Sequence, residues 1–254
     1  MKLRFYKKRL WLWCRSILAR DPEIFCQYGL NVKIPVTADL SIRYNLARGR
    51  PYEAAEAYLI NKYVSVGSNV LELGGCYGII SSLIKRKIGE RAKHIIVEAD
   101  PTLTPICLKN ANLQSSKNKS QVINAAIDYS GAKQVTFVRG SNAHVGRLAK
   151  DGEVGFTIPA ATLGSLLTGF PDGPITLICD IEGAEVDLIR NEHKNLERVE
   201  LIIIETNPAF YDDGENSNQK LVAELEQIGF VKLERRDNVI CFASHDKLKR
   251  VRNN

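Results

Sequence analysis

The chain has 254 residues, of which 44% are hydrophobic and 25% are charged, as is typical of a globular protein with one large α/β domain. The net charge of +6 is concentrated at the ends: the first twenty residues carry seven basic residues and no acid, and the last ten carry four basic residues and one acid. The net acidic body argues against a nucleic-acid groove, and no apolar stretch has the length of a membrane span.

The basic N-terminal segment predicts a helix over residues 3–19 that ends before Asp21-Pro22. Its Trp and Leu residues favour docking on the domain, and contact with a membrane surface is the less favoured alternative. Residues 30–42 alternate weakly and contain Pro35, which indicates short edge strands or a hairpin. We assign residues 1–48 to an N-terminal extension, 49–246 to the main domain and 247–254 to a basic tail.

From residue 52 onward, apolar strands and amphipathic helices alternate. The predicted helices span residues 52–64, 79–87, 101–112, 162–167, 184–191 and 218–227. The predicted strands span residues 69–75, 93–99, 121–127, 133–139, 175–180 and 199–205, and residues 230–235 and 238–243 form a terminal hairpin. A loop-rich stretch follows residue 139. This pattern predicts an α/β fold whose mostly parallel, seven-stranded sheet is covered on both faces and closed by an antiparallel C-terminal edge hairpin.

The six cysteines form no C-x-x-C pair, and four lie in apolar runs. This pattern argues against a zinc site or a disulfide framework and predicts reduced, mostly buried thiols. The apolar run that begins at Leu10 is broken by Arg15 and lacks a small-residue cleavage site, which does not fit a secretory signal. We therefore predict a cytoplasmic protein.

The turn after the first long strand carries the most informative pattern. Val70–Leu73 leads into Gly74-Gly75-Cys76-Tyr77-Gly78, which reads E-x-G-x-x-x-G. A dinucleotide fingerprint would need glycine at position 76, and the phosphate-binding loop G-x-x-x-x-G-K-[ST] is absent. The next strand ends in Glu98, whose carboxylate can accept both hydrogen bonds of a ribose diol. Together, the glycine turn and Glu98 predict a nucleoside ligand that carries no pyrophosphate.

From about Gly49 to about Phe210, the sequence resembles the FkbM-type methyltransferases, a family within the Rossmann-like class that uses S-adenosylmethionine. The resemblance rests on an ordered set of segments: Arg50–Glu53, Val70–Gly78, Val97–Pro101, Val122–Ala126, Leu177–Glu185 and Ile203–Glu205. The segment Asp180-Ile-Glu182-Gly-Ala-Glu185 is the most specific. The departures are mild, and the segments before residue 50 and around 139–160 match only loosely.

The resemblance implies a class I methyltransferase fold with S-adenosylmethionine as cofactor, and it assigns roles to individual residues. The residues expected to hold the cofactor are Glu53, Glu72, Gly74, Gly75, Gly78, Glu98, Ala126 and Asp180. Among them, Glu72 and the glycine turn are expected at its amino-acid end, Glu98 at the ribose and Ala126 near the adenine.

Asp180, Glu182 and His144 are the predicted catalytic residues. His144 lies in a polar, glycine-bounded loop and is a candidate general base, with Glu205 as the other choice. Glu185 either joins the site or charges the first turn of the following helix. The three acids that follow residue 179 could bind a divalent metal, but the resemblance implies none.

The resulting prediction is a methyltransferase that acts on a hydroxyl of a small polar acceptor, such as a sugar or a secondary metabolite. The alternatives are N-methylation and a non-catalytic module that binds the cofactor. Nearby arginines (Arg43, Arg48, Arg50, Arg139 and Arg147) either recognise an acidic group or are solvated, and solvation is favoured.

Overall fold

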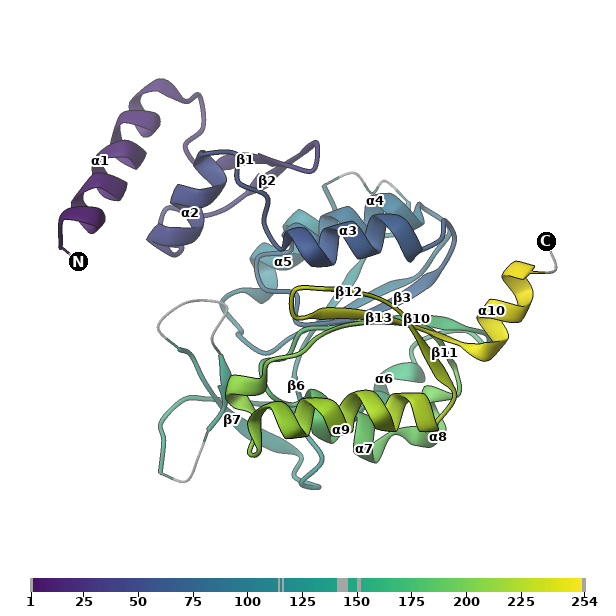
Figure 1. Ribbon diagram of the computed structural model, residues 1–254. Helices are drawn as coiled ribbons and strands as arrows, with labels where there is room; N and C mark the ends of the chain where they lie inside the picture. The colour runs from purple at the N-terminus through teal and green to yellow at the C-terminus, as the bar shows by residue number, and fades with distance from the viewer. Residues whose placement is uncertain (1, 114, 116, 141–145, 150–151, 253–254) are drawn as a thin grey trace.

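A computed structural model describes residues 2–113, 115, 117–140, 146–149 and 152–252 (Figure 1). Its central layer is a seven-stranded sheet in the order β12-β13-β11-β10-β3-β4-β5. The strands are β3 (Asn69–Leu73), β4 (His94–Glu98), β5 (Gln121–Asn124), β10 (Ile175–Cys179), β11 (Val199–Glu205), β12 (Phe230–Arg236) and β13 (Val239–Ser244). β13 pairs antiparallel with both β11 and β12, whereas β11, β10, β3, β4 and β5 pair in parallel. The predicted sheet and its C-terminal hairpin are confirmed.

Helices cover both faces of this sheet, because its strands are apolar on both sides. In Figure 1, α3 (Ala54–Tyr63), α4 (Ile79–Ile88) and α5 (Thr104–Ala111) lie above the sheet. α6 (Leu163–Leu167), α7 (Glu185–Asn191), α8 (His193–Leu196) and α9 (Gly214–Gln227) lie below it. Alternating residues of β10 pack on opposite faces of the sheet: Leu177 and Cys179 pack in the lower core, and Ile178 packs against α3 and α4.

The direction of chain winding reverses at β3. After β3 the chain adds β4 and β5 on one side, and it then returns to place β10 on the other side. The carboxyl ends of β3 and β10 therefore flank a topological switch point, where ligands bind in open α/β sheets. The register pairs Leu73 of β3 with Cys179 of β10, so Gly74 and Asp180 come next to each other.

A second, four-stranded sheet lies beside this edge in the order β6-β9-β7-β8. Its strands are β6 (Ala126–Ile127), β7 (Gln134–Val138), β8 (Arg147–Leu148) and β9 (Phe156–Ala161). The extra strand predicted over residues 133–139 is present as β7. The prediction of a loop-rich stretch after it was wrong for β9, which pairs antiparallel with β7 over residues 156–159 and in parallel with β6 over residues 160–161. The strand predicted over 121–127 is split, and its second half joins this sheet.

The N-terminal extension begins with α1 (Lys2–Leu18), followed by β1 (Ile24–Gln27), β2 (Leu30–Lys33) and α2 (Leu40–Ala47). β1 and β2 form a hairpin around Tyr28 and Gly29, both at positive φ. The prediction of strands over 30–42 holds only as far as β2, because α2 begins at Leu40. The Asn110 side chain joins the extension to α5 by donating to the Lys33 carbonyl oxygen at 2.9 Å and accepting from the Lys33 amide at 2.8 Å.

The C-terminal segment ends in α10 (His245–Arg252), and a short 3-10 turn, η1 (Pro208–Phe210), precedes α9. Within the described part of the chain, no helix is long and apolar enough to cross a membrane. All six cysteines are free. Cys107, Cys179 and Cys241 are buried, but Cys14 and Cys26 are exposed, so the expectation of mostly buried thiols is met by only half of them.

Candidate active site

The glycine turn after β3 is shaped by close backbone packing. Gly74 has φ +95°, and a Cβ there would lie 1.8 Å from the carbonyl oxygen of Asp180. Gly78 has φ +72°, and its Cβ would lie 2.6 Å from the carbonyl oxygen of Cys107. A side chain at either position would therefore be excluded by both conformation and space. Gly75 is also enclosed, because its Cβ would lie 2.6 Å from Cγ2 of Ile96.

A cavity of about 720 Å³, counted with its open mouth, lies at the switch point. Its lining comes from the ends of the central strands (Gly74, Val97, Glu98, Asp180), the turns after them (Cys76, Ile181, Glu182, Ala184) and the preceding segment (Tyr52). The opposite wall is formed by Ala125, Ala126, Ile127, Phe137, Gly146, Arg147 and Leu148. Gly75 and Gly78 are not in the lining; they shape the turn from behind.

Glu98 reaches this cavity from the end of β4 and is 6% exposed. Its carboxylate accepts hydrogen bonds from the backbone amides of Cys76 at 2.6 Å and Asp100 at 2.7 Å. Burial raises the pKa of Glu98 to about 7, against the effect of these two hydrogen bonds. The carboxylate is thus held firmly between the glycine turn and the loop after β4, and its remaining lone pairs can accept from a ligand hydroxyl.

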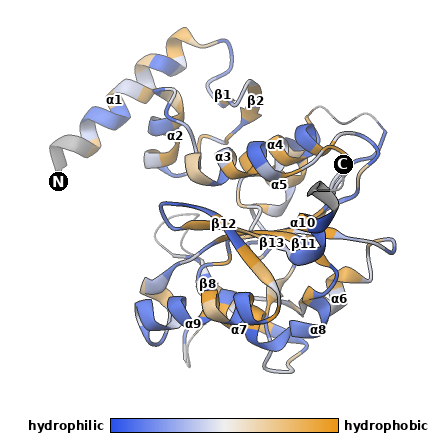
Figure 2. Cartoon of the chain, turned by 45° about the vertical axis from the view of Figure 1, so that its right-hand side comes forward, coloured by the Kyte–Doolittle hydropathy of each residue, from blue (hydrophilic) through white to orange (hydrophobic). Residues whose placement is uncertain are grey.

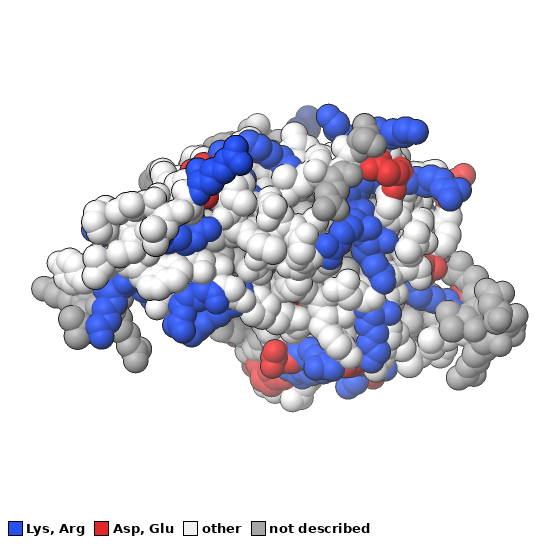
Figure 3. Space-filling view, turned by 90° about the horizontal axis from the view of Figure 1, so that it is seen from above, with Lys and Arg blue, Asp and Glu red and all other residues white. Residues whose placement is uncertain are grey.

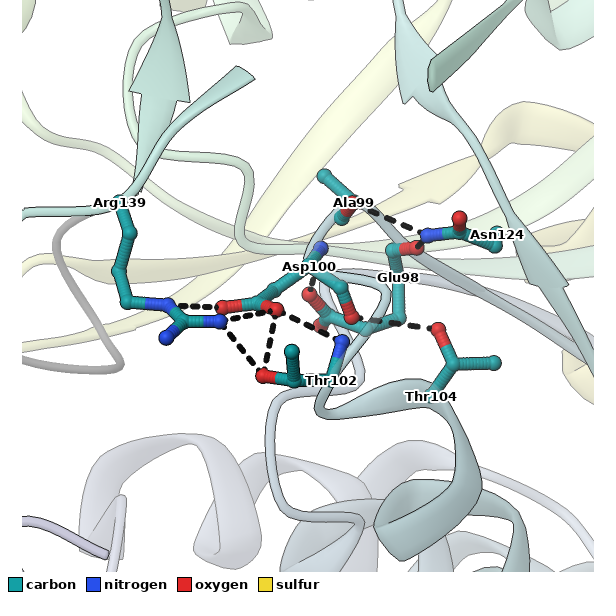
Figure 4. A network of polar contacts seen from close by, with 7 residues as sticks. All are labelled: Glu98, Ala99, Asp100, Thr102, Thr104, Asn124 and Arg139. Atoms are coloured by element: carbon teal, nitrogen blue, oxygen red, sulfur yellow. Dashed lines mark hydrogen bonds and ion pairs between the residues drawn. The ribbon is translucent and has the colours of Figure 1, made fainter. Parts of the chain in front are cut away.

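A network behind Glu98 fixes that loop (Figure 4). Arg139 of the loop after β7 binds Asp100 with two hydrogen bonds, from Nε at 2.6 Å and from Nη2 at 2.7 Å. The Asp100 carboxylate also accepts from the amide and hydroxyl of Thr102, and these partners lower its pKa despite burial. Asn124 donates from its side chain to the carbonyl oxygen of Glu98 at 2.8 Å. Arg139 therefore ties this loop to the end of β7 by its ion pair with Asp100, although its side chain stays 42% exposed.

Asp180 follows β10 at the centre of the site. Its amide donates to the carbonyl oxygen of Leu73 at 2.9 Å, which closes the strand end beside Gly74. Its Oδ1 is buried from solvent and has no hydrogen-bond partner among the described residues. Burial and then the nearby charge of Glu205 raise the Asp180 pKa well above its usual value. A buried polar atom without a partner is costly, so this oxygen is suited to bind a ligand donor.

Glu182 lines the same end of the cavity with its backbone in the left-handed region, at φ 52°. Burial, followed by the charges of Glu205, Glu185 and Glu53, raises its pKa to about 8. A non-glycine residue in this conformation carries strain that the surrounding structure must offset, and such strain is concentrated at functional sites. Asp180 and Glu182 are therefore brought together at the cavity, next to Glu98 and the glycine turn.

The two other acids of this region have different surroundings. Glu185 is fully buried and accepts from the amides of Ile181 at 3.1 Å and Gly183 at 2.9 Å, at the start of α7. This arrangement supports the structural alternative for Glu185, at the positive end of a helix. Glu205, at the end of β11, accepts from the side-chain amide of Asn238 at 2.7 Å and does not line the cavity. Its charge nevertheless acts on Asp180 and Glu182.

Glu72 is placed away from the cavity, contrary to the expectation that it holds the cofactor. Its side chain is buried in β3, where Oε1 accepts from the Ser81 hydroxyl at 2.8 Å and Oε2 contacts His94 Nε2 at 2.9 Å. Successive strand residues point to opposite faces, and Glu72 points toward α4 while its neighbours Leu71 and Leu73 enter the other core. Both carboxylate oxygens are used within the protein, which gives Glu72 a structural role in this arrangement.

Glu53 stands just before α3 in the left-handed region, at φ 44°. Burial and the charge of Glu205 raise its pKa to about 7. Its neighbour Tyr52 lines the cavity, whereas Glu53 lies on the side of a separate hollow formed with α2. The Tyr52 amide donates to Oε1 of Gln27 at 3.0 Å, and the Tyr28 hydroxyl donates to the Tyr52 carbonyl oxygen, so the β1–β2 hairpin holds this segment in place.

Sequence reasoning did not single out Tyr52, Phe137 or Leu148 as site residues. Tyr52 lay within a recognised motif, so a polar aromatic residue beside Glu53 was a usable signal. Phe137 and Leu148 come from the second sheet, whose packing against the switch point no local pattern records. Arg147 also lines the cavity, where its guanidinium pairs with Glu153 at 2.7 Å. His144 lies outside the described residues.

The cavity end formed by Asp180 and Glu182 is acidic, and no Lys or Arg among the described residues forms an ion pair with either carboxylate. Mutual repulsion of carboxylates in a partly desolvated site raises their pKa values, and a bound cation relieves it. The described part of the chain holds no group of three or more His, Cys, Asp or Glu residues with metal-site geometry.

The strand order, with one antiparallel strand inserted beside the parallel ones, and the acid-lined switch point define a Rossmann-like class I methyltransferase. The model of the FkbM methyltransferase domain matches residues 66–232, and the chain belongs to this family of S-adenosylmethionine-dependent enzymes. A search of curated proteins found no match.

Among solved structures, the fibrillarin of Aeropyrum pernix with natively bound S-adenosylmethionine aligns with a TM-score of 0.44 and 14% identity, over 74% of this chain and 72% of its own. A TehB-like methyltransferase from Corynebacterium glutamicum aligns with a TM-score of 0.45 and 10% identity, over 80% and 95%. A structure from Thermoplasma acidophilum described as a putative methyltransferase aligns with a TM-score of 0.42 and 12% identity, over 86% and 79%.

The residues present fit the family's cofactor. S-adenosylmethionine carries two positive charges, on its sulfonium and its amino group, and the unpartnered Oδ1 of Asp180 supplies a buried acceptor for a cationic donor. Glu98 supplies a fixed carboxylate suited to a ribose diol. Ala125, Ala126 and Ile127 supply an apolar wall suited to a flat base.

Proposed function

We propose that this methyltransferase methylates a hydroxyl group of a small polar acceptor. The observation that carries the proposal is the pair Asp180 and Glu182, two carboxylates of raised pKa at one end of the cavity. A hydroxyl donates a hydrogen bond to a carboxylate, and it must lose its proton as the new carbon–oxygen bond forms. A carboxylate with a pKa near 8 accepts that proton more readily than an ordinary one.

We assign the residues of this chain the following roles. The cofactor supplies a methyl group bound to positively charged sulfur. Asp180 and Glu182 orient the acceptor hydroxyl, and one of them takes its proton as the oxygen–carbon bond forms and the carbon–sulfur bond breaks. Glu98 holds the ribose and Ala126 packs beside the adenine. Glu53 adds to the negative potential from outside the cavity lining.

An amine acceptor is the second candidate, and the same acids argue against it. Carboxylates in a desolvated site stabilise the ammonium form of an amine, because they attract its charge. An ammonium ion has no lone pair with which to attack a methyl group. A hydroxyl remains neutral and keeps its lone pairs, so the acidic site favours it.

The proposal is tested by methyl transfer from radiolabelled S-adenosylmethionine to matched acceptors, such as a sugar and the corresponding amino sugar. We expect label only on the hydroxyl-bearing acceptors, in an ether linkage that survives mild alkali. Transfer to nitrogen alone would overturn the proposal of O-methylation. Calorimetry with S-adenosylmethionine alone is run in parallel. If the cofactor does not bind, the failure lies in cofactor binding and not in the choice of acceptor.

Variants separate binding from chemistry. Glu182→Gln should lower kcat by about a hundredfold, the contribution expected of a general base. Asp180→Asn should weaken cofactor binding as well as turnover. Glu197 is exposed and directly follows α8, so Glu197→Gln is the matched control and should leave cofactor binding and turnover unchanged. His144→Ala tests the other candidate base: a loss of kcat in that variant, with Glu182→Gln active, would transfer the proton-accepting role to His144.

A further inference from the structure

One face of α1 is packed against the N-terminal extension. Leu12 is 7% exposed, and Trp11 stacks edge-on against Tyr44 of α2 with ring centroids 5.8 Å apart. Lys8 Nζ donates to the Ser41 hydroxyl at 3.0 Å. Arg15 donates to the carbonyl oxygens of Pro22 and Ile24 at 3.0 Å and 2.6 Å. These contacts hold the helix against α2 and the segment that leads into β1, both within the extension, whereas the docking that the sequence suggested was on the main domain.

The other side of α1 carries an apolar stripe that this docking leaves uncovered. Tyr6, Leu10, Trp13 and Ile17 are 63%, 61%, 60% and 63% exposed. Their spacing of four, three and four residues places them on one face of the helix. Figure 1 shows α1 at the edge of the molecule with α2 beside it, and Figure 2 shows hydrophobic and hydrophilic residues alternating along it. Four aligned, largely exposed apolar side chains form a patch that needs an explanation.

Basic residues flank this stripe. Lys7, Arg9 and Arg20 are all exposed, and the first twenty residues contain no acid. Seen from above, the α1 end of the molecule shows Lys and Arg side chains and few acidic ones (Figure 3). A helix with an apolar stripe, aromatic residues and flanking cations has the composition of helices that lie in the plane of a membrane surface.

We propose that α1 binds an anionic lipid surface, with the stripe of Tyr6, Leu10, Trp13 and Ile17 inserted at the headgroup boundary. Lys7, Arg9 and Arg20 would then meet the lipid phosphates and carboxylates. A second copy of the chain is disfavoured as the occupant, because pairing two such helices would bring their cations together. An RNA is disfavoured because it would engage the cations and leave the four apolar side chains in water.

The two tryptophans of the chain, Trp11 and Trp13, both lie in α1, so intrinsic fluorescence reports on this helix directly. The full chain is mixed with vesicles of phosphatidylcholine alone or of equal parts phosphatidylcholine and phosphatidylserine. We expect co-sedimentation and a blue shift of the emission with the anionic vesicles, both reduced by added salt. No association with the anionic vesicles would overturn the proposal.

Paired variants test the stripe and the cations separately. Leu10→Ser with Ile17→Ser retains both tryptophans and should lower vesicle partitioning about a hundredfold. Arg9→Gln with Arg20→Gln should lower it about thirtyfold on anionic vesicles. Val66→Ser with Val154→Ser removes two side chains that are 79% and 93% exposed elsewhere, and should change nothing.

All of these substitutions are at exposed positions, and unchanged thermal melting of each variant checks that the fold is intact. Equal partitioning of the stripe variant and the unaltered protein would overturn the proposal. Sedimentation at increasing protein concentration adds a further outcome. Self-association that Leu10→Ser with Ile17→Ser abolishes, without vesicle binding, would overturn it and assign the stripe to a second copy.

Discussion

Replacing Glu182 by glutamine should stabilise the cofactor-free protein at high pH, although the same change removes a predicted catalytic group. Burial and neighbouring acids raise the Glu182 pKa from 4.5 to about 8 in the folded protein. Ionisation therefore costs more in the folded than in the unfolded chain. Stability falls as the pH rises from the unfolded pKa toward the folded one, and the full penalty is present above about pH 8.

The size of the effect follows from this shift. A displacement of this size corresponds to about 5 kcal/mol at about 1.4 kcal/mol per pKa unit. Since Glu182 is only partly buried, solvent screening reduces the expected penalty to about 2 kcal/mol. Glutamine has nearly the same shape and the same left-handed strain, so the difference between the two proteins isolates the charge. For a domain of this size, the gain corresponds to a Tm increase of about 4–8 °C.

The assay is thermal denaturation at pH 5 and pH 9 without cofactor. At pH 5 Glu182 is neutral in the folded protein and most of the penalty is absent, so the two proteins should melt close together, whereas at pH 9 the variant should melt clearly higher. The exposed Glu197→Gln serves as the control and should show no pH-dependent difference. A variant that melts lower at pH 9, or by the same margin at both pH values, would refute the argument that Glu182 is held in a desolvated, acidic site.

Three further predictions concern the frame of the site. Gly74→Ala should destabilise the protein by more than about 3 kcal/mol in urea denaturation, because its Cβ would overlap the Asp180 carbonyl oxygen; a loss under about 1 kcal/mol would contradict the close packing. Arg139→Gln should cost about 2 kcal/mol at neutral pH by leaving buried Asp100 without its cation, and the loss should shrink below the usual aspartate pKa of 3.8. Calorimetry should show cofactor affinity rising about tenfold from pH 6 to pH 8 as Glu98 ionises, and a flat profile would argue against its role at the ribose.

Much of the sheet and half of the candidate site follow from local patterns. The runs before Gly74, Glu98 and Asp180 are mostly apolar, as expected of strands buried on both faces, with Glu72 and Thr176 as exceptions. Glycines and acids at the ends of such strands predict a ligand site, because the carboxyl ends of parallel strands share one edge of the sheet. The cavity is lined by Gly74, Glu98 and Asp180 as this reasoning requires.

Local patterns failed where the chain uses unusual turns or weakly apolar strands. The β1–β2 hairpin turns at Tyr28 and Gly29, both at positive φ, and a tyrosine in that position is not a recognised turn signal. β9 contains Pro159 and three exposed residues, so it shows neither continuous apolarity nor clear alternation. The pairing of β9 with β7 compensates for this weak local signal, and only the folded sheet contains that pairing.

The sequence by itself determined the family, the cofactor and the succession of strands and helices along the chain, since these depend on motifs and periodicities carried by neighbouring residues. Only the tertiary structure decided where equivalent acids point. Glu72 and Glu98 both belong to central strands, yet one is enclosed by Ser81 and His94 and the other reaches the cavity. The acidic groups of Glu53, Glu182 and Glu205 act on one another electrostatically because the direction of chain winding reverses at β3. That reversal depends on pairing between strands that are far apart in the sequence, and no single segment encodes it.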